Sequence, residues 1–131
     1  MEPKRITDKK LLSVQEELAS REPIFHRPEL GTSREVFEAM TADEFWETGA
    51  SGKRYSRDFV IDTVVKRYED GYEDDWSAED FYCQVVSPDH YLLSYTLHQG
   101  DRTTRRSTLW RSTGNHWIAV YHQGTIVEES D

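Results

Sequence analysis

The sequence predicts an α+β domain, because helical patterns dominate its first half and strand patterns fill its second half. From Glu79 onward apolar residues fall in short segments separated by turn residues, and no helical pattern returns before Gln123. At 131 residues the chain has the usual length for one hydrophobic core. We therefore expect a single domain over residues 1–131, with helices first and an antiparallel sheet after them.

The first expected helix begins near the N-terminus and ends before two prolines. Thr7 is expected to cap it, with Ile6 packing on Leu11 as a hydrophobic staple. Pro23 and Pro28 bracket a segment that cannot continue the helix, because proline lacks an N–H donor and restricts the residue before it. We interpret this segment as a loop.

Two more helices are predicted before the main sheet. Thr32 and Glu35 have the spacing of a capping box, and the short helix that they start should end near Met40. Ser56 is a suitable N-cap for a third helix. The apolar face of this third helix repeats at helical spacing through Ile61, Val64, Val65 and Tyr68.

Strand patterns occur once early and four times late. The early strand is expected over residues 43–48, after which two glycines turn the chain toward Tyr55, which is expected to pair briefly. The later strands are expected at Asp80 to Val86, Tyr91 to His98, Thr103 to Arg111, and His116 to Gln123. Their connectors are short and turn-like, so neighbouring strands should pair antiparallel in sequence order.

The acidic composition argues against a nucleic-acid partner. The formal net charge is -9 and the pI is near 5.0, whereas affinity for nucleic acid comes largely from Lys and Arg that neutralise phosphates.

The chain has no run of about 18 apolar residues and no apolar stretch behind its basic N-terminal residues, so we expect neither a membrane span nor a secretory signal. Cys83 is the only cysteine, which excludes an intramolecular disulfide. We therefore expect a cytoplasmic protein without a membrane partner.

The five histidines show no metal-binding pattern. His116 and His122 share a strand face, but at about 3.3 Å per residue they lie about 20 Å apart, too far to bind one ion. The sequence also lacks a nucleophile elbow and a glycine-rich phosphate loop. We expect no metal and no cofactor.

Acid–base chemistry would need a carboxylate or a histidine in an apolar pocket, where burial moves its pKa toward the working pH. The last three expected strands contain no acid. Glu44, Glu47 and Asp80 are the carboxylates placed on strands, and Glu44 and Glu47 point to opposite faces. Any acid–base pair must therefore use the early strand, a histidine or a tyrosine. Glu47 and His122 are the candidate catalytic residues.

Alternation in the last expected strand indicates which side chains face the helices. It places Tyr121 and Gln123 on one face and His122 on the other, and both faces carry large apolar groups. One face should therefore meet helices, and the other a second subunit or a curled part of the sheet. We favour Tyr121 and Gln123 inward, because a buried phenol and amide orient a polar ligand at modest desolvation cost, unless a bulge changes the alternation.

Aromatic and polar strand residues are expected to line the ligand pocket. Tyr and Trp each carry a donor that needs a partner, so several of them around one concavity would form a suitable ligand cradle. Core packing is the alternative role for each aromatic residue. The expected ligand-binding residues are Trp46, Tyr95, Arg106, Trp110, Tyr121 and Gln123, with the apolar face of the third helix closing one side.

Two stretches of the sequence resemble a known family. Trp110-Arg111, Trp117 and residues 121–125 (YHQGT) resemble the C-terminal signature of the SnoaL-like proteins, catalogued as domain of unknown function 4440. Residues 45–57 (FWETGASGKRYSR) are similar to the central motif of that family, and the resemblance covers nearly the whole chain. It implies the nuclear transport factor 2-like (cystatin-like) fold, in which a strongly curved antiparallel sheet wraps around helices to form a cone with one mouth. It also implies homodimers that pair through the sheet.

The resemblance leaves the function open, because this superfamily includes isomerases, polyketide cyclases, dehydratases and plain binding domains. Its polyketide cyclases and ketosteroid isomerase rely on pocket carboxylates, which the last three expected strands lack. Our leading interpretation is a domain that binds a small molecule in one hydrophobic and aromatic pocket. One alternative is a SnoaL-like isomerase, cyclase or dehydratase, which a carboxylate and a His or Tyr converging in an apolar cavity would favour. The other is a dimeric protein-interaction module, which a cavity filled by its own side chains would favour.

Overall fold

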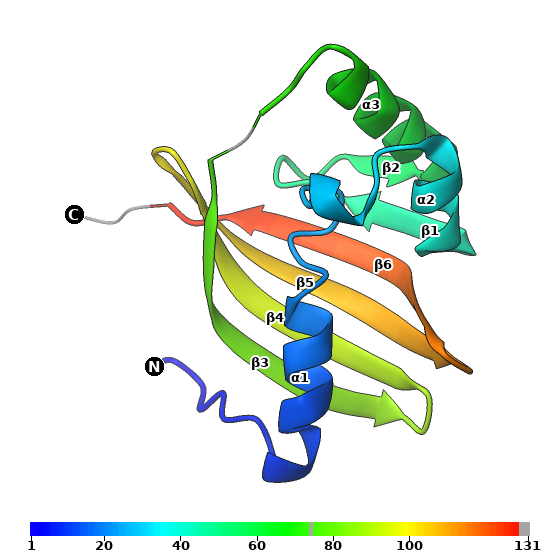
Figure 1. Ribbon diagram of the computed structural model, residues 1–131. Helices are drawn as coiled ribbons and strands as arrows, with labels where there is room; N and C mark the ends of the chain where they lie inside the picture. Colours follow the sequence, from blue (N-terminus) through cyan, green and yellow to red (C-terminus); the bar gives the residue numbers. More distant parts are fainter. Residues whose placement is uncertain (74, 129–131) are drawn as a thin grey trace.

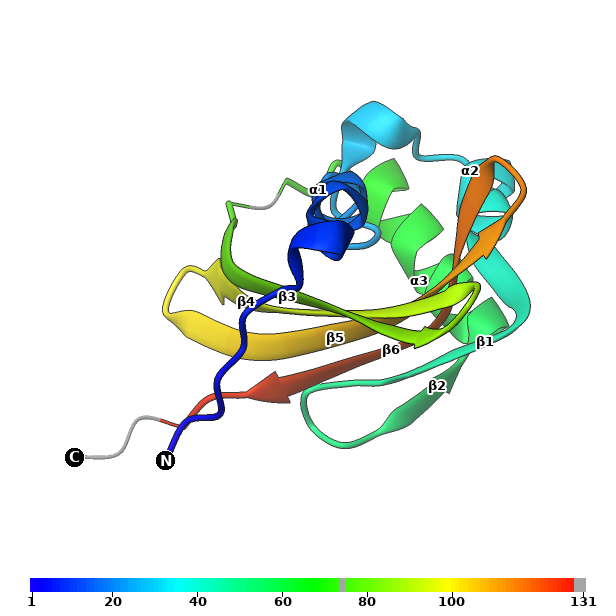
Figure 2. The same ribbon diagram turned by 90° about the horizontal axis from the view of Figure 1, so that it is seen from below.

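The protein forms a curved six-stranded sheet that carries its helices on one face (Figures 1 and 2). The structure is a computed structural model and describes residues 1–73 and 75–128. The strands are β1 (Thr41–Thr48), β2 (Arg54–Ser56), β3 (Ser77–Ser87), β4 (His90–Gln99), β5 (Arg102–Thr113) and β6 (His116–Ile126). They lie in the order β2-β1-β6-β5-β4-β3. The predicted α+β class is confirmed.

Three α-helices precede β3, as the sequence predicts. They are α1 (Leu12–Ala19), α2 (Arg34–Ala39) and α3 (Arg57–Glu69), with short 3-10 segments at Lys9–Leu11 and Pro28–Leu30. Ser56 caps α3 as predicted, accepting a hydrogen bond from the Phe59 N–H at 3.2 Å. The cap of α2 is Ser33, one residue later than expected, and it accepts from the Val36 N–H at 3.3 Å. No described helix is both long and apolar enough to cross a membrane.

The start of the first helix differs from the prediction. Asp8 caps the 3-10 segment that leads into α1, because its side chain accepts a hydrogen bond from the Lys10 N–H at 2.9 Å. The Thr7 hydroxyl instead accepts from the backbone N–H of Cys83 at 3.0 Å and so links the N-terminal segment to β3. Ile6 is 79% exposed and forms no hydrophobic staple.

The last four strands form the predicted antiparallel meander, with each strand paired to its neighbour in sequence. The short strands β1 and β2 extend this sheet at its β6 edge. β1 pairs with β6 in parallel and with β2 antiparallel. Because α3 follows β2 directly, the helix lies over this end of the sheet and can close a concavity there (Figure 1).

A bulge in β6 determines which of its side chains point toward the helices. The β5 partners of Ala119 and Tyr121 are adjacent residues, so Val120 is the extra residue of the bulge. The bulge shifts the alternation by one position. Ala119 and His122 are therefore both buried, at 0% and 4% exposure. The sequence prediction of Tyr121 inward and His122 outward is wrong for this reason.

Candidate functional site

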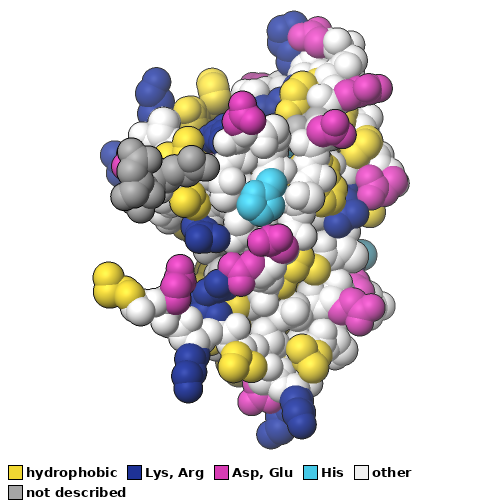
Figure 3. Space-filling view, turned by 90° about the vertical axis from the view of Figure 1, so that its left-hand side faces the viewer, with side chains coloured by type: hydrophobic (Ala, Val, Ile, Leu, Met, Phe, Trp, Pro, Cys, Tyr) yellow, Lys and Arg dark blue, Asp and Glu magenta, His cyan; other side chains and the backbone are white. Residues whose placement is uncertain are grey.

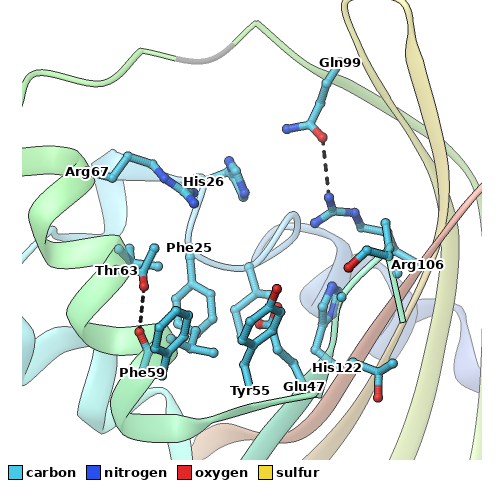
Figure 4. Close-up of a pocket in the computed structure, with 18 of the residues that line it drawn as sticks. Phe25, His26, Glu47, Tyr55, Phe59, Thr63, Arg67, Gln99, Arg106 and His122 are labelled. Carbon is cyan, nitrogen blue, oxygen red and sulfur yellow. Dashed lines mark hydrogen bonds between the residues drawn. The ribbon is translucent and has the colours of Figure 1, made fainter. Parts of the chain in front are cut away.

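A cavity of about 470 Å³ lies between α3, the loop after α1, and strands β1, β2, β5 and β6 (Figure 4). Strand neighbours bring its central polar residues together. Tyr55 pairs with Glu47 across β2 and β1, Glu47 pairs with His122 across β1 and β6, and His122 pairs with Thr108 across β6 and β5. Three of these four residues, Tyr55, Glu47 and His122, line the cavity.

Glu47 is the one carboxylate among the described residues that line this cavity. Burial raises the pKa of Glu47, and the positive charges of Arg106 and Arg67 oppose that rise. No described residue donates a hydrogen bond to its carboxylate within normal distance. The side chain is thus desolvated, yet its oxygens stay available to a ligand, which is the environment of a general base.

His122 lies beside Glu47 and is neutral at physiological pH. Burial, together with the positive charges of Arg106 and His26, lowers its pKa to about 3. Its Nδ1 lies 2.8 Å from the Thr108 hydroxyl oxygen. The imidazole is therefore held by the sheet in one orientation and in its uncharged form.

Behind His122, a second carboxylate is fully enclosed at the closed end of the cone. Glu22 is 0% exposed. One of its oxygens, Oε1, accepts hydrogen bonds from the Tyr95 hydroxyl at 2.8 Å and from the Ile24 N–H at 2.9 Å. The other, Oε2, accepts from the indole N–H of Trp110 at 3.0 Å. Burial raises the pKa of Glu22, and hydrogen bonds from Thr108 and these other donors oppose the rise.

Thr108 connects Glu22 to His122. When Glu22 is ionised, its carboxylate only accepts hydrogen bonds, so the one proton of the Thr108 hydroxyl is directed to Glu22. In that state the Thr108 oxygen accepts from the His122 Nδ1–H. The lone pair of His122 is then on Nε2, where it can accept a hydrogen bond from a ligand in the cavity.

Three arginines line the cavity, and two of them lie on opposite sides of its open space. Arg67 extends from α3, and Arg106 extends from β5 (Figure 4). Arg106 donates from Nε to the Thr104 hydroxyl at 3.1 Å and from Nη2 to the side-chain amide oxygen Oε1 of Gln99 at 3.4 Å. Arg102 lies at the exposed rim.

An aromatic pair forms the apolar part of the wall. The rings of Tyr55 and Phe59 stack with centroids 5.1 Å apart and planes 11° apart. Ile24, Val60 and Val64 add aliphatic surface from the loop and from α3. The apolar face of α3 therefore closes one side of the cavity, next to charged groups on the sheet side.

Six residues were expected to bind the ligand, and the structure separates them into three groups. Arg106 lines the cavity. Tyr95 and Trp110 lie in the closed end of the cone, where their polar groups are occupied by Glu22. Trp46, Tyr121 and Gln123 lie on the opposite face of the sheet. There Trp46 packs on Tyr121 with ring centroids 4.5 Å apart, and the Tyr121 hydroxyl bonds Thr48 at 2.6 Å and Gln123 at 2.9 Å. Both catalytic candidates, Glu47 and His122, line the cavity.

Sequence reasoning missed Glu22, Tyr55 and Arg67. Glu22 precedes the segment interpreted as a loop, and its side-chain partners Tyr95 and Trp110 are 73 and 88 residues away. Tyr55 and Arg67 had local signals, since one follows the glycine turn and the other lies near the end of α3. Among the described residues, no group of three or more His, Cys, Asp or Glu side chains could hold a metal ion.

Comparisons with known proteins support the fold at low sequence identity. No model of a known protein family matches the sequence, and no curated protein matches it significantly. A structure of an NTF-2 like protein of unknown function from Pseudomonas aeruginosa matches with a TM-score of 0.70 and 12% identity, over 88% of this chain and 99% of that chain. An uncharacterized protein with a cystatin-like fold from Caulobacter vibrioides matches with a TM-score of 0.68 and 13% identity, over 86% and 89%.

A third structure, from Parabacteroides distasonis, is named a "putative ketosteroid isomerase". It matches with a TM-score of 0.67 and 14% identity, over 98% of this chain and 100% of that chain. The curved sheet, the helices on its concave side and these three matches agree with one another. The chain has the NTF2-like, cystatin-like fold.

Proposed function

We propose that the cone binds a small organic molecule and that Glu47 removes a proton from it, as in an isomerase or lyase reaction. The observation that carries this proposal is the side-by-side placement of Glu47 and His122 in one cavity. Convergence of a carboxylate with a His or Tyr favours the enzyme alternative over a plain binding domain. An open volume of about 470 Å³ disfavours a pure interaction module, whose cone would be filled by its own side chains.

The proposed reaction begins at a carbon next to a carbonyl group. The Glu47 carboxylate takes the proton, the C–H electron pair forms a C=C bond, and the carbonyl π electrons move onto oxygen to give an enolate. Tyr55, which pairs with Glu47 across β1 and β2, donates a hydrogen bond to that oxygen. His122 accepts a hydrogen bond from the ligand at Nε2. Return of the proton from Glu47 to the same or another carbon completes the step.

Solvent deuterium exchange tests this function without knowledge of the natural substrate. The probes are benzoylpropionate and its methyl ester, each of which has C–H bonds next to a ketone and an aromatic ring for the Tyr55–Phe59 wall. Proton NMR in D₂O should show that the protein speeds exchange of at least one probe. The Glu47→Gln variant should lose about 100-fold or more of this rate, as expected for removal of a general base.

Glu44→Gln is the matched control, because Glu44 belongs to the same strand but is exposed and pairs with Arg111 at 3.3 Å. It should exchange both probes at the wild-type rate. Exchange of neither probe above the buffer rate, or equal rates for wild type and Glu47→Gln, would contradict the proposal.

The finer family assignment and the assembly are part of the same proposal. The motif residues around Tyr55 and around His122 are those that resemble the SnoaL-like proteins, and they meet in this cavity. The outer face of the sheet carries Trp46, which is 43% exposed and packs on Tyr121. We propose that two chains pair through this face to form a homodimer. We also propose that the protein acts in the cytoplasm, a reducing compartment in which its single cysteine remains a free thiol.

Sedimentation at micromolar concentration tests the dimer. The expected mass is about twice the 15.4 kDa of one chain. The Trp46→Glu variant should shift the protein toward the monomer, because it places a charge on the apolar part of the proposed interface. A wild-type protein that sediments as a monomer would refute the dimer and leave the proposed chemistry untouched.

A further inference from the structure

We propose that the ligand of this cavity is an organic acid whose carboxylate lies between Arg67 and Arg106. The inference rests on the proposed function and specifies its substrate class. It depends on the charge of the cavity, on the pairing of arginines elsewhere in the molecule, and on the apolar wall beside the two guanidinium groups.

The cavity arginines differ from most arginines of the chain. Among the described residues, none of Arg67, Arg102 and Arg106 forms an ion pair with a carboxylate. Six arginines outside the cavity do so, namely Arg5, Arg21, Arg27, Arg34, Arg105 and Arg111. On the surface shown in Figure 3, basic side chains likewise lie among acidic ones. In a chain of net charge -9, carboxylates are plentiful, so the unpaired guanidinium groups in the cavity call for another anion.

Each of the two facing arginines is already oriented by uncharged partners. Arg106 is held by Thr104 and Gln99, and the guanidinium carbon of Arg67 lies 5.0 Å from the ring centroid of Tyr72. These contacts position the side chains without neutralising them, and the one carboxylate that lines the cavity among the described residues, Glu47, acts on both charges without forming an ion pair with either. Preorganised guanidinium groups bind an anion with little loss of side-chain entropy, and their planar N–H pairs match the two oxygens of a carboxylate.

The rest of the cavity indicates that the anion belongs to an organic molecule. Beside the arginines, the Tyr55–Phe59 stack and the side chains of Val60 and Val64 present an apolar wall that a free inorganic anion would leave uncovered. Glu47 also lines this space, and as the base of the proposed reaction it would repel a second negative charge near the reacting carbon. A carboxylate at one end of an apolar skeleton satisfies both conditions.

Calorimetric titration of benzoylpropionate, its methyl ester and inorganic phosphate into the full chain tests the inference. At pH 7 and low salt, the acid should bind wild type about tenfold or more tightly than the ester, because the ester lacks the charge-assisted hydrogen bonds. The variants Arg67→Gln and Arg106→Gln should each weaken binding of the acid by about tenfold and leave binding of the ester within about twofold.

Two variants remove a positive charge without touching the cavity. Arg105→Gln changes the neighbour of Arg106 on the outer face of β5, and Lys66→Gln changes the exposed neighbour of Arg67 on α3. Both should bind the acid within about twofold of wild type. Equal affinity for acid and ester, equal losses in the cavity and control variants, or tighter binding of phosphate than of the acid would each overturn the inference.

These results separate the inference from the proposed function. If the ester binds as well as the acid and exchanges deuterium in a Glu47-dependent manner, the anion site is refuted and the proton-transfer function stands. If the acid binds through the arginines but neither probe exchanges, the anion site stands and the proton-transfer function is refuted.

Discussion

The cone contains two carboxylates whose environments differ in one respect. Glu22 and Glu47 are both desolvated, and burial raises the pKa of each. At the closed end, the oxygens of Glu22 are occupied by donors from Tyr95, Trp110 and Ile24. At the open end, Glu47 has positive charges near it but no described hydrogen-bond donor.

This difference assigns separate roles to two residues of the same type. A buried carboxylate whose oxygens all accept hydrogen bonds satisfies the buried donors around it and has no capacity left for a ligand. A buried carboxylate with free oxygens destabilises the fold at neutral pH and can accept a proton from a bound molecule. Thr108 and His122 lie between the two, so the closed end also orients a group that serves the open end.

The largest expected effect is on stability at the closed end. Glu22→Ala should lower the free energy of unfolding by about 3–5 kcal/mol, because it leaves the Tyr95 hydroxyl and the Trp110 N–H buried without an acceptor. Urea unfolding followed by tryptophan fluorescence measures this loss. Glu29→Ala is the control, since Glu29 is exposed and pairs only with Arg27 at 3.3 Å among the described residues. A loss below about 1 kcal/mol for Glu22→Ala would refute the structural role.

An effect that reaches a comparable size only at low pH is expected from His122. Its folded pKa of about 3 lies below the unfolded value of 6.5, so the unfolded chain binds a proton between these values and the folded chain does not. Stability should therefore be highest above pH 6.5 and should fall by about 1.4 kcal/mol per pH unit as the pH drops from 6.5 toward 3. The His122→Asn variant should show a shallower fall between pH 6.5 and 4 in urea unfolding.

His116→Asn is the matched control for this titration, because His116 is an exposed residue of the same strand. It should reproduce the wild-type slope. If the stability of His122→Asn falls with pH as steeply as that of wild type, burial does not hold His122 in the neutral form. The contact from Glu22 through Thr108 to His122 then has no support as a means of orienting the imidazole.

How far the sequence predicts this molecule depends on how local each signal is. The cap at Ser56 and the apolar face of α3 arise from neighbouring residues, and both are confirmed. The meander of β3 to β6 follows from short turns, which are also local. These features depend on backbone propensity and spacing, so one sequence is sufficient to predict them.

The candidate site was harder to predict because it depends on distant contacts and on one inserted residue. Val120 shifts the alternation of β6, and this single bulge exchanges the positions of Tyr121 and His122. Strand alternation alone therefore placed the ligand residues on the wrong face. Glu22 acquires its role only when β4 and β5 pack against the segment after α1, and no short-range pattern encodes that packing.

The smallest expected effect concerns the open end and has the opposite sign from that of Glu22→Ala. The folded pKa of Glu47 is raised, so the folded chain holds a proton more tightly than the unfolded chain. The associated stability is complete below the unfolded pKa of about 4.5 and is lost as the pH rises through the folded pKa. At pH 7 the raised pKa of Glu47 therefore makes the folded protein less stable than it would be with an unshifted carboxyl group. Glu47→Gln should be more stable than wild type by on the order of 1 kcal/mol at that pH, and the gain should vanish at pH 4.

Glu44→Gln separates this effect from a general response to lost charge. The hydrogen bond from Arg111 lowers the pKa of Glu44, so its linkage has the reverse sign and its removal should not stabilise the protein at pH 7. Melting temperatures of the three proteins at pH 7 and pH 4 provide the comparison. A Glu47→Gln variant that melts below wild type at pH 7 would mean that the carboxylate is satisfied in the folded state, as Glu22 is. In that case the open end would have no reactive carboxylate, and the cavity would be a binding site without proton-transfer chemistry.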